Sequence, residues 1–323
     1  MRAMVVGENG LELRDIPVPE AGPGQVLVRV RAAGLNRAEL AMAAGHAHGT
    51  LGGRGATIGL EWAGEVAAIG EGVTGLHEGE RVMCSGNGGY AEYALTDHGR
   101  VSPLPGNNMG WEQAATLPIA LQTMHNALVT VGGLQRGQTV LIQGASSGVG
   151  LMGMQIANEM GAGLVIGSST STERRARLAE FGAGMTVDSA DPGWPDAVLA
   201  ATGGSGVDLV IDQVSGPVIN GNLRATRVLG RIVNVGRLGG ATGEFDFDLH
   251  AVRRISYVGV TFRTRSVEEV RDINRRMRED LWAAVEAGRL HLPIDRTFPL
   301  EQAVEAQAHM RTNAHFGKIV LTV

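Results

Sequence analysis

The chain reads TVLIQGASSGVGL over residues 139–151, where an apolar run ends in a glycine-rich turn and continues into a helical pattern. Residues 140–143 have the length and apolar character of a short buried strand. Apolar residues then recur at spacings of three and four, on one helix face: Val149, Met152, Ile156 and Met160. A helix N-terminus presents unpaired backbone N–H groups at the positive end of the helix dipole. The stretch therefore predicts a turn that can hold a pyrophosphate.

Three glycines of this turn match the dinucleotide fingerprint in part. Gly144, Gly148 and Gly150 fit its needs for a tight turn, a close approach to the ligand and a close helix contact. The spelling GASSGVG departs from a strict G-x-G-x-x-G, and a turn that simply joins a strand to a helix is the competing interpretation. The binding interpretation assigns the ligand to one continuous set of residues: Gly144, Ala145, Ser146, Ser147, Gly148 and Val149.

The residues after the turn favour the binding interpretation. Strands are expected at residues 163–167, 207–212 and 230–235, with helices at 173–181 and 217–228 between them. Such alternation predicts a parallel sheet wound with right-handed crossovers. The predicted fold class is therefore α/β, with a doubly wound parallel sheet.

Length, charge and cysteine content limit the possible classes of protein. A chain of 323 residues can form two domains with substantial cores. The net charge of -5 and the pI near 6.0 argue against a nucleic-acid binder. No signal-peptide region follows Met1 and no apolar run reaches membrane-spanning length, so a cytoplasmic location without a membrane partner is expected. The single cysteine, Cys84, excludes an intramolecular disulfide and a cysteine-based zinc cluster.

Short strands dominate the first hundred residues. They are expected at the following ranges, which predict a small barrel or sandwich: 11–16, 26–31, 64–69, 81–84 and 90–94. A helix at 36–44 is expected to start near Asn36. Residues 45–55 (GHAHGTLGGRG) are predicted to form a flexible loop that could cover a site.

The last third of the chain is expected to return to the first domain. A helix at 267–287, with its arginines on a solvated face, and a helix at 300–310 precede a closing strand at 318–323. Sequence order leaves that strand without a partner in the nucleotide-binding half. Because no long linker appears, the two halves are expected to pack closely, with the substrate in a cleft between them.

Seven motifs occur together in one order along almost the whole chain: AAGLNRAEL, GLEWAGEV, GGYAEYA, LQTMHNAL, GASSGVGLMGMQIA, EFGA and HFGKIVL. With this ordered set the chain resembles the zinc-independent quinone oxidoreductase (zeta-crystallin-like) branch of the medium-chain dehydrogenase/reductase superfamily. The resemblance implies a GroES-like, β-rich catalytic domain at residues 1–119 and 261–323, with a Rossmann domain inserted at 120–260. It also implies a nicotinamide cofactor and a homodimer or a tetramer, in which the strand at 257–262 pairs across subunits.

Zinc chemistry is not expected. Relatives that use zinc carry a cysteine in the segment of Asn36 and a histidine directly before the glutamate that corresponds to Glu61. Here those places hold Asn36 and Leu60, and the structural lobe with four cysteines is missing. His46 and His48 are two residues apart on one loop. Two histidines are too few ligands for a tetrahedral site. No metal is therefore predicted.

The segment after the second strand of the nucleotide-binding half points to NADPH. NAD-selective sites usually end this strand in an acidic residue, whereas residues 167–175 read GSSTSTERR. By resemblance, Ser171 and Arg174 fall where NADPH-dependent relatives place a serine and a basic residue. The alternative is that Arg174 and its charged neighbours only decorate an exposed, capped helix. Further cofactor contacts are expected from these residues: Ser168, Gln213, Val235, Gly236, Arg237, Phe316, Gly317 and Lys318.

Without zinc, the expected chemistry is hydride transfer from the nicotinamide to an electron-poor acceptor, either a quinone or an α,β-unsaturated carbonyl. Asn36 is implied to face the nicotinamide, and Thr123 to touch the carboxamide or the ribose. His46, His48 or solvent is expected to supply the proton, whereas Tyr90 is assigned to the core. The alternative function is a catalytically silent NADPH-binding protein with a structural or regulatory role.

Overall fold

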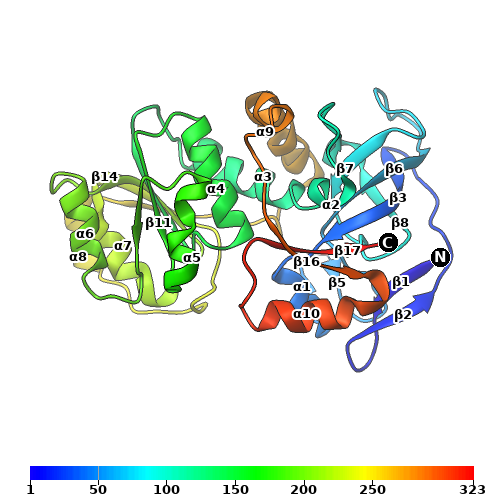
Figure 1. The fold of residues 1–323 in the computed structure, drawn as a ribbon, viewed down its shortest axis with the longest axis horizontal. Coiled ribbons are helices and arrows are strands. Elements are labelled where there is room, and N and C mark those ends of the chain that lie inside the picture. Colours follow the sequence, from blue (N-terminus) through cyan, green and yellow to red (C-terminus); the bar gives the residue numbers. More distant parts are fainter. Residues whose placement is uncertain (50) are drawn as a thin grey trace. The chain divides into compact units, whose positions relative to one another are not determined.

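The structure, a computed structural model, describes residues 1–49 and 51–323 and divides into two compact units. Unit 1 combines Met1–Ile119 with Phe262–Val323, and unit 2 is the continuous stretch Ala120–Thr261. In Figure 1, blue, cyan, orange and red mark unit 1, and green and yellow mark unit 2. Each unit has its own sheet.

Unit 2 contains a six-stranded parallel sheet with the order β12-β11-β10-β13-β14-β15. Its strands are β10 (Thr139–Gln143), β11 (Leu164–Ser168), β12 (Met185–Val187), β13 (Val207–Asp212), β14 (Thr226–Asn234) and β15 (Ser256–Gly259). In chain order the strands begin at β10 in the middle of the sheet, continue to the edge at β12, and then add β13 to β15 on the other side. The doubly wound dinucleotide-binding fold has the same arrangement. The predicted fold class is confirmed for this unit, and the predicted strands at 163–167, 207–212 and 230–235 correspond to β11, β13 and β14.

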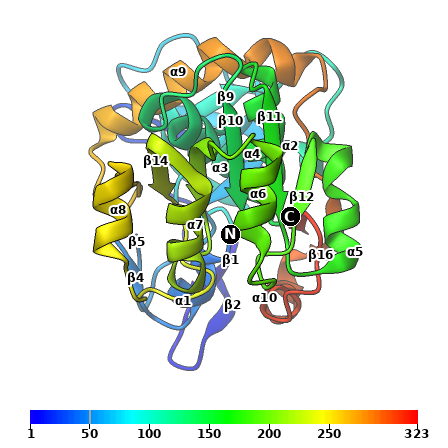
Figure 2. The ribbon, with the colours of Figure 1, turned by 90° about the vertical axis from the view of Figure 1, so that its left-hand side faces the viewer.

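Helices cover this sheet. The strands are connected through α4 (Gly148–Glu159), α5 (Thr172–Ala176), η3 (Leu178–Phe181), α6 (Trp194–Ala201), η4 (Gly216–Val218), α7 (Ile219–Ala225) and α8 (Phe247–Arg253). Figure 2 shows α6, α7 and α8 side by side, and α4 packs on β10 and β11. The helix expected at 217–228 ends earlier, because β14 already begins at Thr226. A longer helical run, α3 (Pro118–His125) and the π-helical η2 (Asn126–Val131), leads into the sheet.

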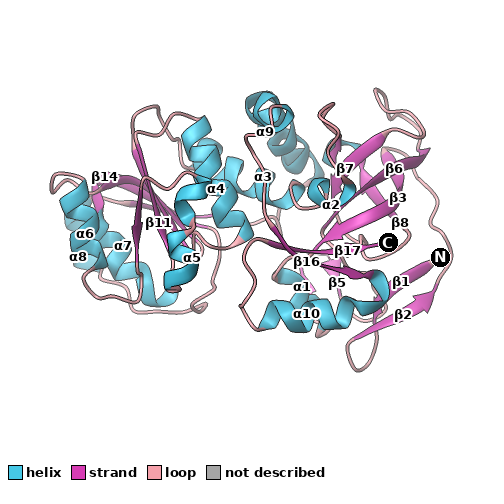
Figure 3. Cartoon of the chain, in the orientation of Figure 1, coloured by secondary structure: helices cyan, strands magenta, loops and turns pink. Residues whose placement is uncertain are grey.

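Unit 1 is rich in strands (Figure 3). Its largest sheet has seven strands in the order β16-β17-β3-β6-β7-β9, with β8 also paired to β3. These are β3 (Gln25–Gly34), β6 (Glu61–Ile69), β7 (Arg81–Ser85), β8 (Tyr93–Asp97), β9 (Val101–Pro103), β16 (Ile294–Pro299) and β17 (Lys318–Thr322). Strand β17 pairs antiparallel with β3, which confirms that the closing strand returns to the first domain.

The remaining elements of unit 1 are short, with one exception. They are β1 (Arg2–Val6), β2 (Leu11–Asp15), β4 (Ala47–His48), β5 (Leu51–Gly52), α1 (Ala38–Ala43), η1 (His98–Arg100), α2 (Trp111–Ala114), η5 (Leu300–Gln302) and α10 (Ala303–Arg311). The exception is α9 (Val267–Glu286), which begins at a capping box: the Ser266 hydroxyl accepts from Glu269 N, and the Glu269 carboxylate accepts from Ser266 N. The predicted helix at 267–287 is confirmed.

Two predictions for the first domain need correction. The segment at 45–55 is not entirely loop, because β4 and β5 form a short hairpin within it; Thr50 lies outside the described residues. The strand expected at 90–94 begins at Tyr93, because the main-chain groups of Tyr90 are bonded elsewhere: its N–H donates to Ile58 O in a loop, and its C=O accepts from Met4 N on β1.

Candidate functional site

The glycine-rich turn of unit 2 has a physical reason for two of its glycines. Gly144 has a φ of 71°, a conformation that side chains with a Cβ rarely adopt. A Cβ on Gly150 would lie 2.6 Å from the Gly144 oxygen, so the helix can approach the turn only with glycine here. Between them Ser147 caps α4, and its hydroxyl accepts from Gly150 N at 3.0 Å. The local sequence thus places the N-terminus of a twelve-residue helix at the end of β10.

The turn fits a diphosphate because its donors remain available. In the described part of the chain, the backbone N–H groups of Ser146, Gly148 and Val149 face no protein acceptor. These groups lie at the positive end of α4, where an anion is stabilised. By contrast, Gly144 N and Ala145 N are already used, since they donate to Ser168 Oγ at 3.0 Å and Ser168 O at 2.9 Å. Ser168 therefore fixes the start of the turn, and the N–H groups at its helix end remain available to a ligand.

The end of β11 carries hydroxyls in place of a carboxylate. Ser168 is fully buried and bonds within the protein, and the Ser169 hydroxyl donates to Ser146 Oγ at 3.0 Å. Ser171 caps α5 and accepts from Arg174 N at 3.3 Å, so its position at a helix start is as the alternative interpretation expects. Arg175 is committed elsewhere, because its guanidinium donates to Ser169 O at 2.7 Å and pairs with Asp188 at 3.0 Å.

Arg174 lies half-buried in the first turn of α5. It therefore lies beside the capped N-terminus, close in sequence to the hydroxyl residues that end β11. Its assignment to a phosphate on the adenosine ribose stays a prediction.

The carboxyl ends of β13 and β14 meet this turn. The Gln213 amide donates to Gln143 O at 3.2 Å, and its oxygen lies 3.1 Å from the Ser147 hydroxyl that donates to it. Val235 N donates to Asp212 O at 2.7 Å, and a Cβ on Gly236 would lie 2.7 Å from the main-chain carbonyl oxygen of Gln213. The structure thus brings the turn, Gln213 and Gly236 together along one edge of the sheet.

Asp212 acts as a turn cap. Its Oδ1 accepts from Val214 N at 2.8 Å and from Ser215 N at 2.9 Å. Burial raises the pKa of its carboxyl group, and these hydrogen bonds oppose the rise.

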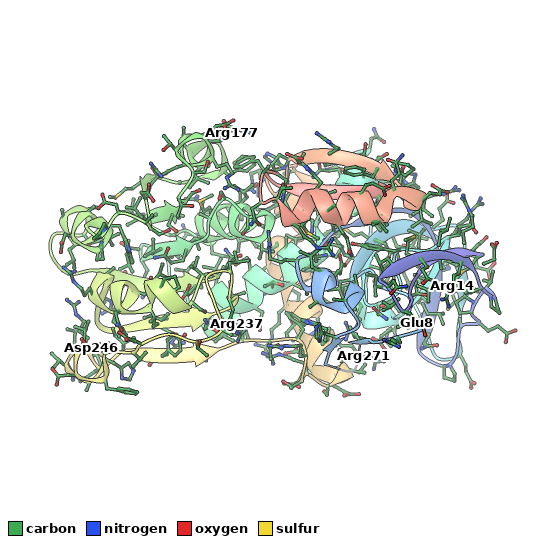
Figure 4. The ribbon with its side chains drawn as sticks, turned by 90° about the horizontal axis from the view of Figure 1, so that it is seen from below. Glu8, Arg14, Arg177, Arg237, Asp246 and Arg271 are labelled. Atoms are coloured by element: carbon green, nitrogen blue, oxygen red, sulfur yellow. The ribbon has the colours of Figure 1, made fainter. Side chains whose placement is uncertain are left out.

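Arg237, labelled in Figure 4, follows β14 and lines a cavity of about 140 Å³ together with Tyr257 and residues of the neighbouring loops.

Thr123, the remaining site residue predicted in unit 2, lies on α3 and is half-buried. Its assignment to the carboxamide or the ribose stays a prediction.

In unit 1, Asn36 belongs to a buried charged cluster. Its Oδ1 accepts from Lys318 Nζ at 3.1 Å, and its Nδ2 donates to Glu61 Oε1 at 3.0 Å. Lys318 Nζ also pairs with Glu61 Oε1 at 2.5 Å and donates to Leu35 O at 2.7 Å. Glu61 Oε2 in turn accepts from Ile119 N at 2.8 Å. Asn36, Glu61 and Lys318 are all buried, so the amide of Asn36 is held in one orientation.

Glu39 forms the second half of this cluster. Its carboxylate accepts from Asn36 N and Leu60 N, each at 2.7 Å, and from the hydroxyl of Tyr90. It therefore joins the start of α1 to the start of β6. Burial raises the pKa of Glu39 to about 7, although the three donors and Lys318 lower it. The helix expected to start near Asn36 begins at Ala38, with Arg37 at the N-cap. The Asn36 side chain does not cap it, because its amide is bound to Glu61 and Lys318.

The two histidines proposed as proton donors differ in environment. His46 is exposed, whereas His48 is half-buried on β4. Burial lowers the pKa of His48, and Arg263 lowers it further, so the neutral imidazole is favoured there. A neutral imidazole still donates one N–H, but it is a weaker acid than the imidazolium.

The predicted residues before β17 lie on a tight turn. Phe316 is buried and its N–H donates to Asp295 Oδ1 at 3.2 Å. Gly317 has a φ of 89°, and a Cβ there would lie 2.2 Å from Pro293 O. Lys318 follows and points its ammonium into the buried cluster. Its proposed contact with the cofactor stays a prediction, as do those of Phe316 and Gly317.

Sequence reasoning missed several residues of these networks. Glu39, Tyr90 and Asn222 were not assigned a site role, because their side chains bond to residues distant in sequence. Tyr90 lies 51 residues from Glu39, and Asn222, whose amide oxygen accepts from Gln143 Nε2 at 2.8 Å, lies 79 residues from Gln143. Among residues 1–49 and 51–323, no group of three or more His, Cys, Asp or Glu side chains is arranged to hold a metal ion. None of the helices in that same part of the chain has the length and apolar character needed to cross a membrane. Cys84 is buried, and burial raises the pKa of its thiol.

Comparisons with known proteins agree with this architecture. Two family models match the chain, an alcohol dehydrogenase GroES-like domain over residues 22–106 and a zinc-binding dehydrogenase over residues 148–279. Quinone oxidoreductase of Rattus norvegicus is 31% identical over 334 residues, which cover 99% of this chain and 97% of that relative. Polyketide synthase GfsB of Streptomyces halstedii is 33% identical over 305 residues, which cover 93% of this chain but 5% of that relative.

Solved structures show the same fold. An NAD-dependent alcohol dehydrogenase is 29% identical with a TM-score of 0.83, and a mycobacterial protein solved with NADPH is 25% identical with a TM-score of 0.87. Each covers 100% of this chain and of its own chain. The GroES-like character of unit 1 and the Rossmann-like character of unit 2 are thereby confirmed. The chain belongs to the medium-chain dehydrogenase/reductase superfamily, in the branch that holds the quinone oxidoreductases.

Proposed function

We propose that the chain is a zinc-independent, NADPH-dependent oxidoreductase that reduces a quinone or an activated carbon–carbon double bond. One observation carries the cofactor part: the turn at residues 144–149 leaves the N–H groups of Ser146, Gly148 and Val149 without a protein acceptor, while the end of β11 carries hydroxyls and is followed by Arg174. The complex of a mycobacterial relative with NADPH supports it.

Different residues of unit 2 are assigned to different parts of the dinucleotide. The helix N-terminus of α4 stabilises the diphosphate, and Arg174 with Ser171 selects the phosphate on the ribose. Gln213, Val235, Gly236 and Arg237 lie at the carboxyl ends of β13 and β14, where the nicotinamide half is expected. When bound, NADPH supplies a hydride to the acceptor.

The cluster of unit 1 supports a mechanism without zinc. Glu61 already has a cationic partner in Lys318, and the position before it holds Leu60, whose side chain has no metal-binding atom. Asn36 has one N–H that is bound to Glu61 and a second that makes only a long contact of 3.4 Å with Gly34 O. We assign this second N–H to the oxygen on which negative charge develops, where a positioned donor stabilises the transition state.

Protonation of the reduced acceptor needs a separate donor. His46 and His48 remain the candidates, with solvent as the third, and Thr123 stays assigned to the cofactor. The lowered pKa of His48 favours the neutral imidazole, so His48 either donates as a neutral group or takes no part. Comparing kcat of His46→Asn with that of His48→Asn shows which histidine, if either, supplies the proton. If solvent supplies the proton, we expect neither variant to lose more than about tenfold in kcat.

Turnover tests the proposal. NADPH oxidation is measured with 1,2-naphthoquinone, 1,4-quinones, alkenals, cyclic enones and acrylates, and the products are analysed to separate a semiquinone from a saturated carbonyl. Reduction of a quinone or an enone supports the proposal, and the better substrate names the acceptor class. Tight NADPH binding without turnover on the whole panel favours a structural or regulatory protein instead.

We also propose a homodimer, formed at the β15 edge of the unit 2 sheet. Strand β15 ends the strand order on one side. Tyr257 on this strand is 40% exposed, and on the preceding helix α8 Phe247 is 76% and Val252 is 68% exposed. Unpaired strand edges next to apolar surface are usual places for subunit contact.

A further inference from the structure

A chain of buried side-chain hydrogen bonds crosses unit 2 beneath the carboxyl edge of its sheet. Gly144 N donates to Ser168 Oγ at 3.0 Å, and Ser168 Oγ donates to Gln143 Oε1 at 2.6 Å. Gln143 Nε2 then donates to Asn222 Oδ1 at 2.8 Å, and Asn222 Nδ2 donates to Asp212 Oδ2 at 3.0 Å. The chain thus runs from β11 through β10 and α7 to β13.

The direction of this chain is fixed at both ends. Gly144 N is a backbone donor, so the Ser168 hydroxyl accepts from it and gives its own proton to Gln143. An ionised Asp212 is an acceptor only, so the amide nitrogen of Asn222 must face it. Both amides between these ends therefore have one orientation, and each has its oxygen toward Ser168 and its nitrogen toward Asp212. Such directed chains strengthen each bond within a low-dielectric interior.

The far end of the chain holds a second turn. Asp212 Oδ1 fixes Val214 N and Ser215 N, and Ser215 has a φ of 61° although it is not glycine. The Ser215 hydroxyl donates to Gly236 O at 2.7 Å and accepts from the Asn234 amide. The strained turn and Gly236 are thus held by the same carboxylate that Asn222 contacts.

We infer that Asn222 is a positioning residue that couples the diphosphate turn at Gly144 to the nicotinamide-side turns at Val214 and Gly236. Asn222 is fully buried on α7 and has a side chain that bonds to Gln143 and Asp212, so it acts on the ligand site through other residues. The inference rests on the proposed function, in that residues 144–149 hold NADPH.

Asn222→Asp is the sharpest test, because it keeps the shape of the side chain. The new carboxylate can still accept from Gln143 Nε2, but it can bond to Asp212 only when one of the two carries a proton. Two carboxylates in contact share a proton at low pH and repel each other once both are ionised. Tyr257 and Arg237 also act on this region: burial and Asp212 raise the pKa of Tyr257, and Arg237 lowers it.

The dissociation constant of NADPH is measured by its fluorescence from about pH 5.5 to 8.5, with the thermal unfolding midpoint of the ligand-free protein followed in parallel. Asn222→Asp is expected to bind NADPH almost as the wild type does at the low end and about tenfold more weakly at the high end, relative to the wild type at each pH. Asn220→Asp is the matched control on the same helix, since Asn220 lies outside the chain and its Oδ1 accepts from Asp246 N.

Each outcome decides one question. A lower unfolding midpoint with a wild-type pH profile of NADPH binding overturns the inference and leaves Asn222 a core residue only. If Asn222→Asp does not fold, Ser168→Ala and Asn222→Ser are compared singly and together, because breaks in one chain give effects on NADPH affinity that do not add. Additive effects then overturn the inference. A wild-type chain that fails to bind NADPH overturns the proposed function and the inference with it.

Discussion

Arg174 decides the choice of nicotinamide cofactor in the proposed function. We expect Arg174→Glu to reduce the preference for NADPH over NADH in kcat/KM by about ten- to a hundredfold, because a charge-assisted bond to phosphate contributes about 1.5–3 kcal/mol. Arg177→Glu is the matched control: Arg177 lies just past α5, where it is exposed and pairs with Glu180 (Figure 4). An equal loss in both variants, or equal use of both cofactors by the wild type, contradicts the assignment.

Lys318 balances a buried carboxylate, and its removal tests that balance. Lys318→Met leaves Glu61 buried and uncompensated, which is expected to lower the free energy of unfolding by about 3–5 kcal/mol. Adding Glu61→Gln to this variant removes the charge and is expected to restore part of the loss. Chemical denaturation measures both. Equal stability of the single and double variants would show that the pair carries no electrostatic term.

Burial of Glu39 is expected to make the free energy of unfolding fall as the pH rises. Its folded-state pKa of about 7 lies above the ordinary value of 4.5, so the folded state holds the proton more tightly than the unfolded state does. The contribution is complete below about pH 4.5 and is lost as the pH rises to about 7, with a total of about 3 kcal/mol. Glu39→Gln is expected to flatten the pH dependence of unfolding in this window. A wild-type slope in that variant contradicts the assignment to Glu39.

Individual residues show where sequence reasoning reaches its limit. Gly144 and Gly150 were predicted with their physical roles, because turn geometry is local and depends on neighbours in the chain. The partner of Asn36 was not predicted, since Lys318 lies 282 residues away and only the pairing of β17 with β3 brings it near. Local signals thus predict a turn, whereas a buried ion pair depends on the register of distant strands.

Among the elements, β15 forms one open edge of the unit 2 sheet, and it is the edge assigned to the proposed homodimer. Phe247→Asp, made next to this strand, is expected to weaken the proposed homodimer more than tenfold, because about 1.5–3 kcal/mol of apolar burial is lost and a charge is placed at the contact. Light scattering over a range of concentrations measures the mass. Val304→Asp on α10, where Val304 is 47% exposed, serves as the control. A dimer that survives Phe247→Asp places the contact elsewhere.

Elements with a long periodic pattern were predicted best. Helix α9 was located by its amphipathic pattern, and Ser266 and Glu269 provide the start signal. Helix α7 was predicted too long, since strand β14 begins at Thr226 and the apolar residues that follow pack as strand. Whether a short apolar run becomes helix or strand is decided by its neighbours in the sheet, which the sequence of the run does not contain.

At the scale of the whole molecule, the two units differ in how their chains are connected. Residues 120–261, expressed alone, are expected to fold and to bind NADPH, because the six-stranded sheet is built from one continuous stretch. Residues 1–119 alone are expected to remain unfolded, because β3 lacks β17 and Glu61 lacks Lys318. Circular dichroism and proton NMR measure both. A cooperatively folded fragment 1–119 contradicts this reading of unit 1.

The pairing of β17 with β3 also sets an order of events during synthesis. The ribosome completes all of unit 2 before it makes Lys318, which lies 283 residues after the Leu35 carbonyl that it contacts. Domains generally fold as units while the chain emerges. The nucleotide-binding unit can therefore fold on the ribosome, whereas β3 and β6, which are made earlier, cannot complete their sheet until β17 has been synthesised. During that interval Glu61 lacks the ammonium of Lys318, so we expect the segment that carries β3 and β6 to stay incompletely folded and open to chaperone binding.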